Sequence, residues 1–414
     1  MPGWVFYPLG FLLFVLPSVA VTVKSGATTV FLLFLIPALM FGWRGWGELF
    51  AEEKVILCSM LLFVLFSSFS LINSSNISEA MSSFEKHLRF LAFIPMYLLV
   101  RRNELNLGPW LLLGCLFGCV VMGLVASYEF HMLGENRPNG VRNAARFGLV
   151  AVIAFLLLVH LLIVEWRNKI ILFAGIIASG LIVYAITLNQ TRSAMILLLP
   201  FFALMILYCR ERFNKTVIIF ISIIFFMVLL FSVHPSSPVA KRFAIVKEDI
   251  AALRKDPIEN YKSSTGLRLH MVYTGVSIFI QSPMFGTGFG DYALDAQALM
   301  DSGKTYVKDG WLLTSPHNIY VNALAETGIV GFVGLALSVF FAPFYCYIKL
   351  SSRRKNDQKI RFYIYAGTTC LLSYLIFGLF HTWTNINNSV SIFLLLQLVF
   401  ISNGFNLMSK NIKY

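Results

Sequence analysis

Arginines recur in the connections between the long apolar segments of this sequence. Arg137, Arg142 and Arg146 share one connection, Arg192 stands in a very short turn, and Arg268 lies in a long polar segment. Arginine is charged at any ordinary pH, and its planar guanidinium group can bind a phosphate through two parallel hydrogen bonds. Several such side chains brought together at a membrane surface would suit a lipid-linked diphosphate.

The competing interpretation is that these side chains reach lipid headgroups at the membrane boundary. We favour headgroup contact for Arg146 and for Arg89. For Arg192 we favour a functional role, because so short a turn has little structural need of a guanidinium group. For Arg137 and Arg142 the two interpretations stay open.

His317 has the residue type and position to transfer a proton. Ser315 is a good helix N-cap and Pro316 suits the first helical position, so the sequence predicts His317 in the first helical turn. The helix dipole there disfavours the imidazolium ion, and a neutral imidazole can accept a proton near pH 7. A histidine that only forms a hydrogen bond at a helix end is an equally open alternative.

Further polar residues follow on the same segment. Asn322 and Glu326 lie within an apolar stretch, where a carboxylate is costly unless it is paired or faces a wet cavity. Gly328 and Gly331 would allow another helix to approach closely. His381, in the turn 381–385, is an additional candidate to line a site.

Several other kinds of chemistry have no counterpart in the sequence. It contains no Asp-x-Asp pair, no phosphate-binding glycine loop and no cluster of metal-ligand residues. The six cysteines fall within or at the ends of apolar blocks, where cysteine usually packs as a small hydrophobic residue. We therefore expect no metal, no cofactor and no disulfide framework.

The elements that position these residues are expected to be membrane-spanning helices. Only 13% of the 414 residues are charged, about half the 25% of a soluble domain, and the apolar residues come in blocks of about 20. Because the blocks lack two-residue alternation, helices are favoured over the strands of a barrel. The sequence predicts an all-α polytopic protein with about twelve transmembrane helices: 4–22, 26–43, 54–73, 87–100, 108–129, 147–165, 169–188, 193–209, 216–233, 319–348, 361–380 and 388–407.

Orientation is predicted from the basic residues in the short connections. They cluster in alternate connections, near 101–102, 167–169, 210–215, 349–361 and 410–413, and this set is expected to be cytoplasmic together with both termini. The first apolar block, from Trp4, is expected to be a retained span and not a removable signal peptide. The net charge of +13 reflects this topology, so nucleic-acid binding is not implied.

One outer connection is long and is expected to be structured, which divides the chain into 1–233, 234–317 and 318–414. An amphipathic helix on the membrane surface is predicted from apolar residues at helical spacing, Phe243, Val246, Ile250 and Leu253. A second helix is predicted over 265–281, with a glycine-rich turn at 286–290 after it. A third should run from Asp291, as N-cap, to about Met300.

Three motifs in the second half resemble those of bacterial lipopolysaccharide O-antigen ligases, within the wider ligase and polymerase group. They are LNQTRS at 188–193, GLRLHM at 266–271 leading to SP at 282–283, and HN at 317–318 with ETGIVG at 326–331. RNAARFG at 142–148 is also similar to that family, although less specifically. The first four predicted spans resemble it only in hydropathy.

This resemblance implies a membrane glycosyltransferase fold of the GT-C-like kind in the bacterial inner membrane, with its site facing the periplasm. It implies transfer of the O-antigen glycan from undecaprenyl diphosphate to the outer core sugar of lipid A–core, with inversion and without metal or nucleotide. His317 would be the general base, and Arg192 and Arg268 would hold the diphosphate. Further substrate contacts are expected from Arg137, Arg142, Asn318, Asn322 and Glu326.

Two alternatives remain open. An O-antigen polymerase would use the same chemistry on a glycan acceptor still attached to its lipid carrier. A transporter of lipid-linked sugar is more distant, because it should show internal repeats or broken helices around a midplane site, and the sequence shows no convincing repeat.

Overall fold

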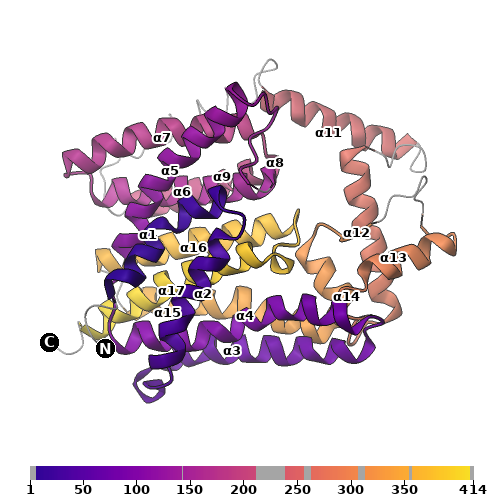
Figure 1. Cartoon of the computed structure of the whole chain (residues 1–414), viewed down its shortest axis with the longest axis horizontal. Coiled ribbons are helices and arrows are strands. Elements are labelled where there is room, and N and C mark those ends of the chain that lie inside the picture. The colour runs from indigo at the N-terminus through magenta and orange to yellow at the C-terminus, as the bar shows by residue number, and fades with distance from the viewer. Residues whose placement is uncertain are drawn as a thin grey trace.

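The structure is a computed structural model that describes residues 6–141, 143–210, 238–255, 263–305, 313–353 and 357–410. Every regular element in these residues is a helix (Figure 1). The all-α prediction is thus confirmed for this part of the chain. Arg142 and the predicted span 216–233 lie outside the described residues.

Seven helical segments of the described residues are long and apolar enough to cross a membrane. They are α3 with η3 (Ala51–Asn73), α5 (Gly108–His131), α6 (Ala144–Val164), α7 (Lys169–Asn189), α14 to α15 (Ile319–Arg353), α16 (Gln358–Gly378) and α17 (Asn387–Lys410). Shorter apolar helices are α1 (Phe6–Thr22), α2 (Gly26–Phe41) and the α8–α9 segment (Arg192–Met205). A polytopic membrane protein is confirmed, whereas the predicted number of twelve spans is not.

Helix α17 forms the centre of the bundle. It is buried along nearly its whole length and packs against α16, α4 and α2 (Figure 1). Its apolar residues recur around the whole helix, and its buried polar side chains, such as Gln397 and Asn406, form hydrogen bonds with neighbouring helices.

Helix α4 (Ile77–Arg102) extends well beyond the span predicted at 87–100. Its 26 residues correspond to about 39 Å, more than the roughly 30 Å of a bilayer core. The Asn76 side chain caps it by accepting hydrogen bonds from the amides of Ser78 and Glu79. The sequence criterion of an apolar run missed the first half of α4 because that half is polar on one face.

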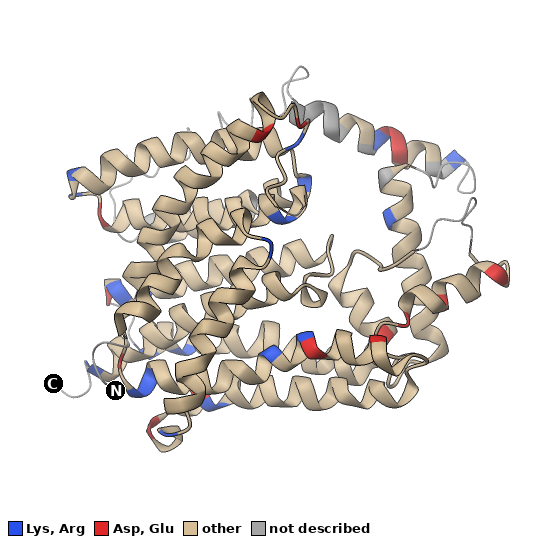
Figure 2. Cartoon of the chain, viewed as in Figure 1, with Lys and Arg blue, Asp and Glu red and all other residues tan. Residues whose placement is uncertain are grey.

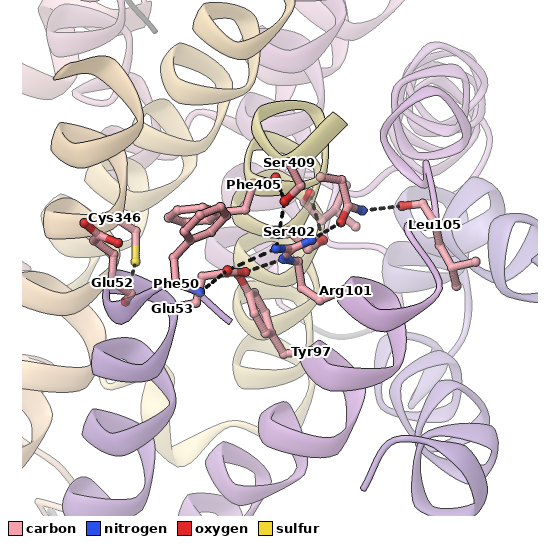
Figure 3. A network of polar contacts seen from close by, with 12 residues as sticks. Phe50, Glu52, Glu53, Tyr97, Arg101, Leu105, Cys346, Ser402, Phe405 and Ser409 are labelled. Carbon is pink, nitrogen blue, oxygen red and sulfur yellow. Dashed lines mark hydrogen bonds and ion pairs between the residues drawn. The ribbon is translucent and has the colours of Figure 1, made fainter. Parts of the chain in front are cut away.

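At the far end of α4, a buried ion pair links three helices (Figure 3). The Arg101 guanidinium group pairs with the Glu53 carboxylate of α3 and donates a hydrogen bond to Asn406 of α17, at 2.6 Å. Tyr97 also donates to Glu53, at 2.6 Å. Removing one partner of such a buried pair typically costs about 3–5 kcal/mol, so this network fixes α3, α4 and α17 relative to one another.

The long connection contains the three predicted helices: α11 (Pro238–Lys255), α12 (Ser264–Gln281) and α13 (Tyr292–Asp301). The positive φ angles at 286, 288 and 290 confirm the glycine turn. Asp291 occupies the N-cap position of α13 as predicted, but its carboxylate makes no capping hydrogen bond and instead accepts one from the Ser75 amide at 2.6 Å. Of the four residues that predicted an amphipathic α11, only the Ile250 side chain is described, and it is exposed.

Helix α14 (Ile319–Leu335) is interrupted at Gly328, which has φ 62° and ψ −168°. The freed backbone groups on both sides of this break are paired with the segment 282–290. Thr287 and Gly288 amides donate to the carbonyls of 325 and 326, and the amides of 329 and 330 donate to the carbonyls of 283 and 284. The break therefore docks the long connection onto a membrane helix.

We expect Gly328→Ala to destabilise the protein. Its backbone region is almost restricted to glycine and costs another residue about 1–3 kcal/mol, and a Cβ atom would lie 2.4 Å from the Met284 carbonyl group. Thermal unfolding in detergent measures the effect. Gly180→Ala in α7 is the matched control, because nothing lies within 4 Å of its Cβ position. Equal stability of the two variants would contradict a structural role for the break.

Candidate active site

A cavity of about 870 Å³ opens where the long connection meets the helix bundle. Its lining residues come from α4, the α5–α6 connection, α6, α8, α11, α12, the segment before α14, α14 itself and the α16–α17 connection. Such a volume falls within the usual range of ligand sites. Figure 2 shows basic residues on α8 and α12, whereas most of the bundle is uncharged.

Four arginines from separate segments line this cavity: Arg137, Arg146, Arg192 and Arg268. We call them the arginine wall. Three of them were candidates for phosphate contact, and the structure brings these three together. Arg146, for which headgroup contact was favoured, lines the cavity as well. Arg89 is not among the lining residues, and its guanidinium group donates a hydrogen bond to Asn387.

The short turn that carries Arg192 is fixed by the neighbouring connection. Arg137 donates hydrogen bonds to the Asn189 carbonyl at 3.0 Å and to the Thr191 hydroxyl at 3.2 Å. The Asn189 side chain in turn donates to the carbonyls of Pro138 and Ala144, at 2.7 and 2.8 Å. The turn is thereby held against the α5–α6 connection, so that Arg192 is presented by a rigid support.

Arg268 experiences the positive charge of this wall. Partial loss of water lowers the pKa of its guanidinium group, and repulsion from Arg192 and Arg137 lowers it further. Arg192 and Arg137 are thus electrostatic neighbours of Arg268 in the cavity that all three line. A diphosphate, with several acceptor oxygens, matches such a concentration of charge.

The start of α14 differs from the prediction. The helix begins at Ile319, and Asn318 is its N-cap, with its side-chain oxygen accepting hydrogen bonds from the amides of Tyr320 and Val321 at 2.9 and 3.1 Å. The predicted N-cap Ser315 is therefore wrong. An asparagine that satisfies two amides is the better cap, and it displaces the earlier candidate.

His317 consequently lies just before the helix, in the left-handed region at φ 49°. Its amide donates to the Ser315 hydroxyl at 3.2 Å, which helps to hold this conformation. Its pKa is lowered from the usual value, first by burial and then by the charge of Arg268. The lowered pKa agrees with the neutral imidazole expected from the sequence, and burial and the charge of Arg268 are its causes.

His381 forms a second imidazole group in the cavity. Its ring stacks on Phe377 with centroids 4.2 Å apart, and it lies 6.1 Å from the ring of His317. Its Nε2 atom shares a hydrogen bond of 3.2 Å with the Ser193 hydroxyl. Burial, followed by the charge of Arg268, lowers its pKa to about 3, so this ring stays neutral beside the arginine wall.

The three remaining predicted contacts are placed differently. Glu326 lines the cavity and accepts a hydrogen bond from Asn322 at 3.0 Å. Asn322 and Asn318 are not among the lining residues. The Asn318 amide group also donates to the Leu379 carbonyl at 3.2 Å, so its side chain is occupied with capping and docking.

Part of the chain that lines this cavity matches a known protein family. Residues 177–336 match the O-antigen ligase family. This stretch carries Arg192, Arg268, His317 and Glu326, four of the residues that line the cavity. The family match implies sugar transfer of the O-antigen ligase and polymerase type in a membrane. An uncharacterised protein of Haemophilus influenzae is similar too, with 25% identity over 314 residues that cover 74% of this chain and 76% of its own.

Part of the cavity lies outside the stretch that matches the ligase family. Arg137, Arg146 and His381 belong to this part, as does a row of polar side chains on α4 that the sequence analysis missed. The polar residues of that row recur at helical spacing just before the span predicted at 87–100, and this pattern could have predicted a polar helix face. In the residues that the structure describes, no group of three or more His, Cys, Asp or Glu is arranged to hold a metal ion.

Proposed function

We propose that this protein is an O-antigen ligase. It transfers an O-antigen glycan from undecaprenyl diphosphate to the outer core sugar of lipid A–core at the periplasmic face of the inner membrane. One observation carries the proposal: a histidine with a lowered pKa and four arginines from separate segments share a single cavity. The match of 177–336 to the ligase family supports it.

In the proposed reaction, His317 removes the proton of the acceptor hydroxyl group. The hydroxyl oxygen then attacks the anomeric carbon of the donor glycan, while the bond from that carbon to the phosphate oxygen breaks. Attack opposite to the leaving group inverts the configuration. A base and a stabilised leaving group are the two requirements of this displacement.

The arginine wall supplies the second requirement. Arg192 and Arg268 hold the diphosphate, and their charge stabilises the negative charge that develops on the leaving oxygen. Arg137 serves mainly to fix the turn before Arg192, since it donates to Asn189 and Thr191. Because His381 stays neutral, we infer that it acts through shape and hydrogen bonding.

The orientation belongs to the same proposal. The basic connections predicted to be cytoplasmic include Arg101 and Arg102, at the end of α4 remote from the cavity. Lys349 and Arg353 at the end of α15 belong to the same set. By the positive-inside rule, this distribution supports a cavity that opens to the periplasm, with both termini in the cytoplasm.

The polymerase alternative uses the same cavity and differs only in the acceptor. The transporter alternative gains one feature from the structure, since α14 is a broken helix. However, the backbone groups freed by this break are hydrogen-bonded to the segment 282–290, so they are not available to a solute. We therefore continue to favour the ligase over the transporter.

The decisive experiment is glycan transfer by purified protein. Undecaprenyl-diphosphate-linked O-antigen is supplied with either lipid A–core or a second lipid-linked repeat as acceptor, and the products are separated by gel electrophoresis. We expect glycosylated lipid A–core. Extension of only the lipid-linked repeat would identify a polymerase. If folded protein transfers glycan to neither acceptor, the proposal is contradicted.

A further inference from the structure

A row of four polar residues lines the cavity from the first half of α4: Glu79, Ser82, Ser83 and Lys86. Their spacing places them on one face of the helix. We call this row the α4 stripe. Ala80, Phe84 and His87, on a neighbouring face of the same helix, are buried at 0, 8 and 7% exposure, so that face packs against the protein interior.

The α4 stripe is held rigidly. His87 packs against Phe63 and Phe289 with ring centroids 5.0 and 4.9 Å away. The start of α4 is also tied to the long connection through the hydrogen bond from the Ser75 amide to Asp291. A binding surface on such a supported helix keeps its geometry without a ligand, which lowers the entropic cost of binding.

The chemistry of the α4 stripe differs from that of the arginine wall. The stripe combines one carboxylate, two hydroxyl groups and one ammonium group, so its formal charges cancel, whereas the wall is made of cations only. In the part of the chain that the structure describes, these four side chains form no hydrogen bond or ion pair with another side chain. Mixed donors and acceptors without net charge suit the hydroxyl groups of a sugar better than a diphosphate.

The two walls lie apart but are connected by α14. In Figure 1, α4 runs through the lower part of the view and α8 lies in the upper part. His317, before α14, is an electrostatic neighbour of Arg268 in the arginine wall. Glu326, further along α14, is an electrostatic neighbour of Lys86 in the α4 stripe. His317 therefore lies beside the arginine wall, and α14 extends from it toward the α4 stripe in the same cavity.

We propose that the α4 stripe is the binding subsite for the acceptor saccharide, while the diphosphate of the donor occupies the arginine wall. This inference rests on the proposed transfer function and assigns one substrate to each wall. Glu79 and the two serines bind hydroxyl groups of the acceptor sugar. The nucleophilic hydroxyl group is thereby directed toward His317.

The test uses two variants of the full-length protein. Glu79→Gln combined with Ser82→Ala alters two exposed side chains of the stripe, so folding is preserved. Glu85→Gln is the matched control, because Glu85 lies on the same helix, is 65% exposed and is not among the cavity-lining residues. KM is measured for the acceptor at saturating donor and for the donor at saturating acceptor, with whichever acceptor the transfer assay identifies.

We expect the stripe variant to raise KM for the acceptor about tenfold to a hundredfold, as lost hydrogen bonds to a charged group predict. The KM of the stripe variant for the donor should stay within about twofold of the wild-type value, and so should both KM values of Glu85→Gln. Native mass spectrometry of acceptor binding gives a second measurement that needs no turnover.

Failure of the inference differs from failure of the proposed function. Normal transfer by wild type, with an unchanged acceptor KM in the stripe variant, would overturn the α4 subsite and leave the ligase intact. An equal rise of both KM values would overturn it as well. If wild type does not transfer glycan, lipid A–core is the probe: equal binding of it by wild type and variant, or none by either, overturns the subsite independently.

Discussion

Replacement of His317 by alanine should lower the rate of glycan transfer by about 10²–10⁴-fold, the usual contribution of a positioned general base. The acceptor hydroxyl group would then have to lose its proton to water while it attacks the anomeric carbon. The structure supports this role because the imidazole lies in the cavity and its pKa is lowered, which keeps it neutral and able to accept a proton. Initial rates with purified protein at saturating donor and acceptor measure the effect.

Binding must be separated from chemistry in this experiment. His317→Ala should still bind the lipid-linked donor, because the arginine wall is unchanged. His131→Ala is the matched control, since this exposed histidine at the end of α5 pairs with Tyr184 and is not among the cavity-lining residues. A His317→Ala protein that folds normally and keeps more than about a tenth of the wild-type rate would contradict the base assignment.

Replacement of Arg268 by glutamine should lower kcat by about 10²–10³-fold, the typical cost of removing one group that stabilises charge in the transition state. It should also change the pH dependence of the residual activity. The charge of Arg268 lowers the pKa of His317 and also that of His381. Without this charge, the pKa of His317 rises.

The direction of the pH effect on the transfer rate follows from the protonation state that His317 needs as a base. A general base works only when it is neutral, so the rate falls as pH drops through its pKa. In the wild type this fall should be centred below the ordinary histidine value of 6.5. In Arg268→Gln its midpoint should move to higher pH. Rates across the acid range, measured at saturating substrates, give both midpoints.

Arg102→Gln is a suitable control for the loss of one positive charge, because Arg102 lies at the end of α4 remote from the cavity. Its rate and its acid midpoint should match those of wild type. An unchanged midpoint in Arg268→Gln, together with a lowered kcat, would mean that the acid limb does not report on His317. A normal kcat would remove Arg268 from the diphosphate site.

The sequence determined the helical, membrane-embedded character of the protein and much of its site chemistry. Apolar runs, N-caps and glycine turns are local properties, so α12 and the turn at 286–290 could be predicted from neighbouring residues alone. The candidate arginines could be found in the same way, because the sequence alone shows which basic residues fall outside the connections predicted to be cytoplasmic. Arg192, Arg268 and His317 indeed share one cavity.

Only the tertiary structure decided how these residues meet. The break at Gly328 depends on hydrogen bonds to a segment about forty residues earlier in the chain, which no local pattern reveals. Two residues, Ser315 and Asn318, could cap the start of α14. Asn318 is the cap in the structure, because its side chain accepts hydrogen bonds from two amides and also donates one to the Leu379 carbonyl. The lowered pKa values of His317 and His381 arise from burial and from Arg268, which lies far from both in sequence. The α4 stripe likewise lines the cavity because segments distant in the sequence pack together. From the sequence alone, nothing shows what the polar face of α4 will lie against.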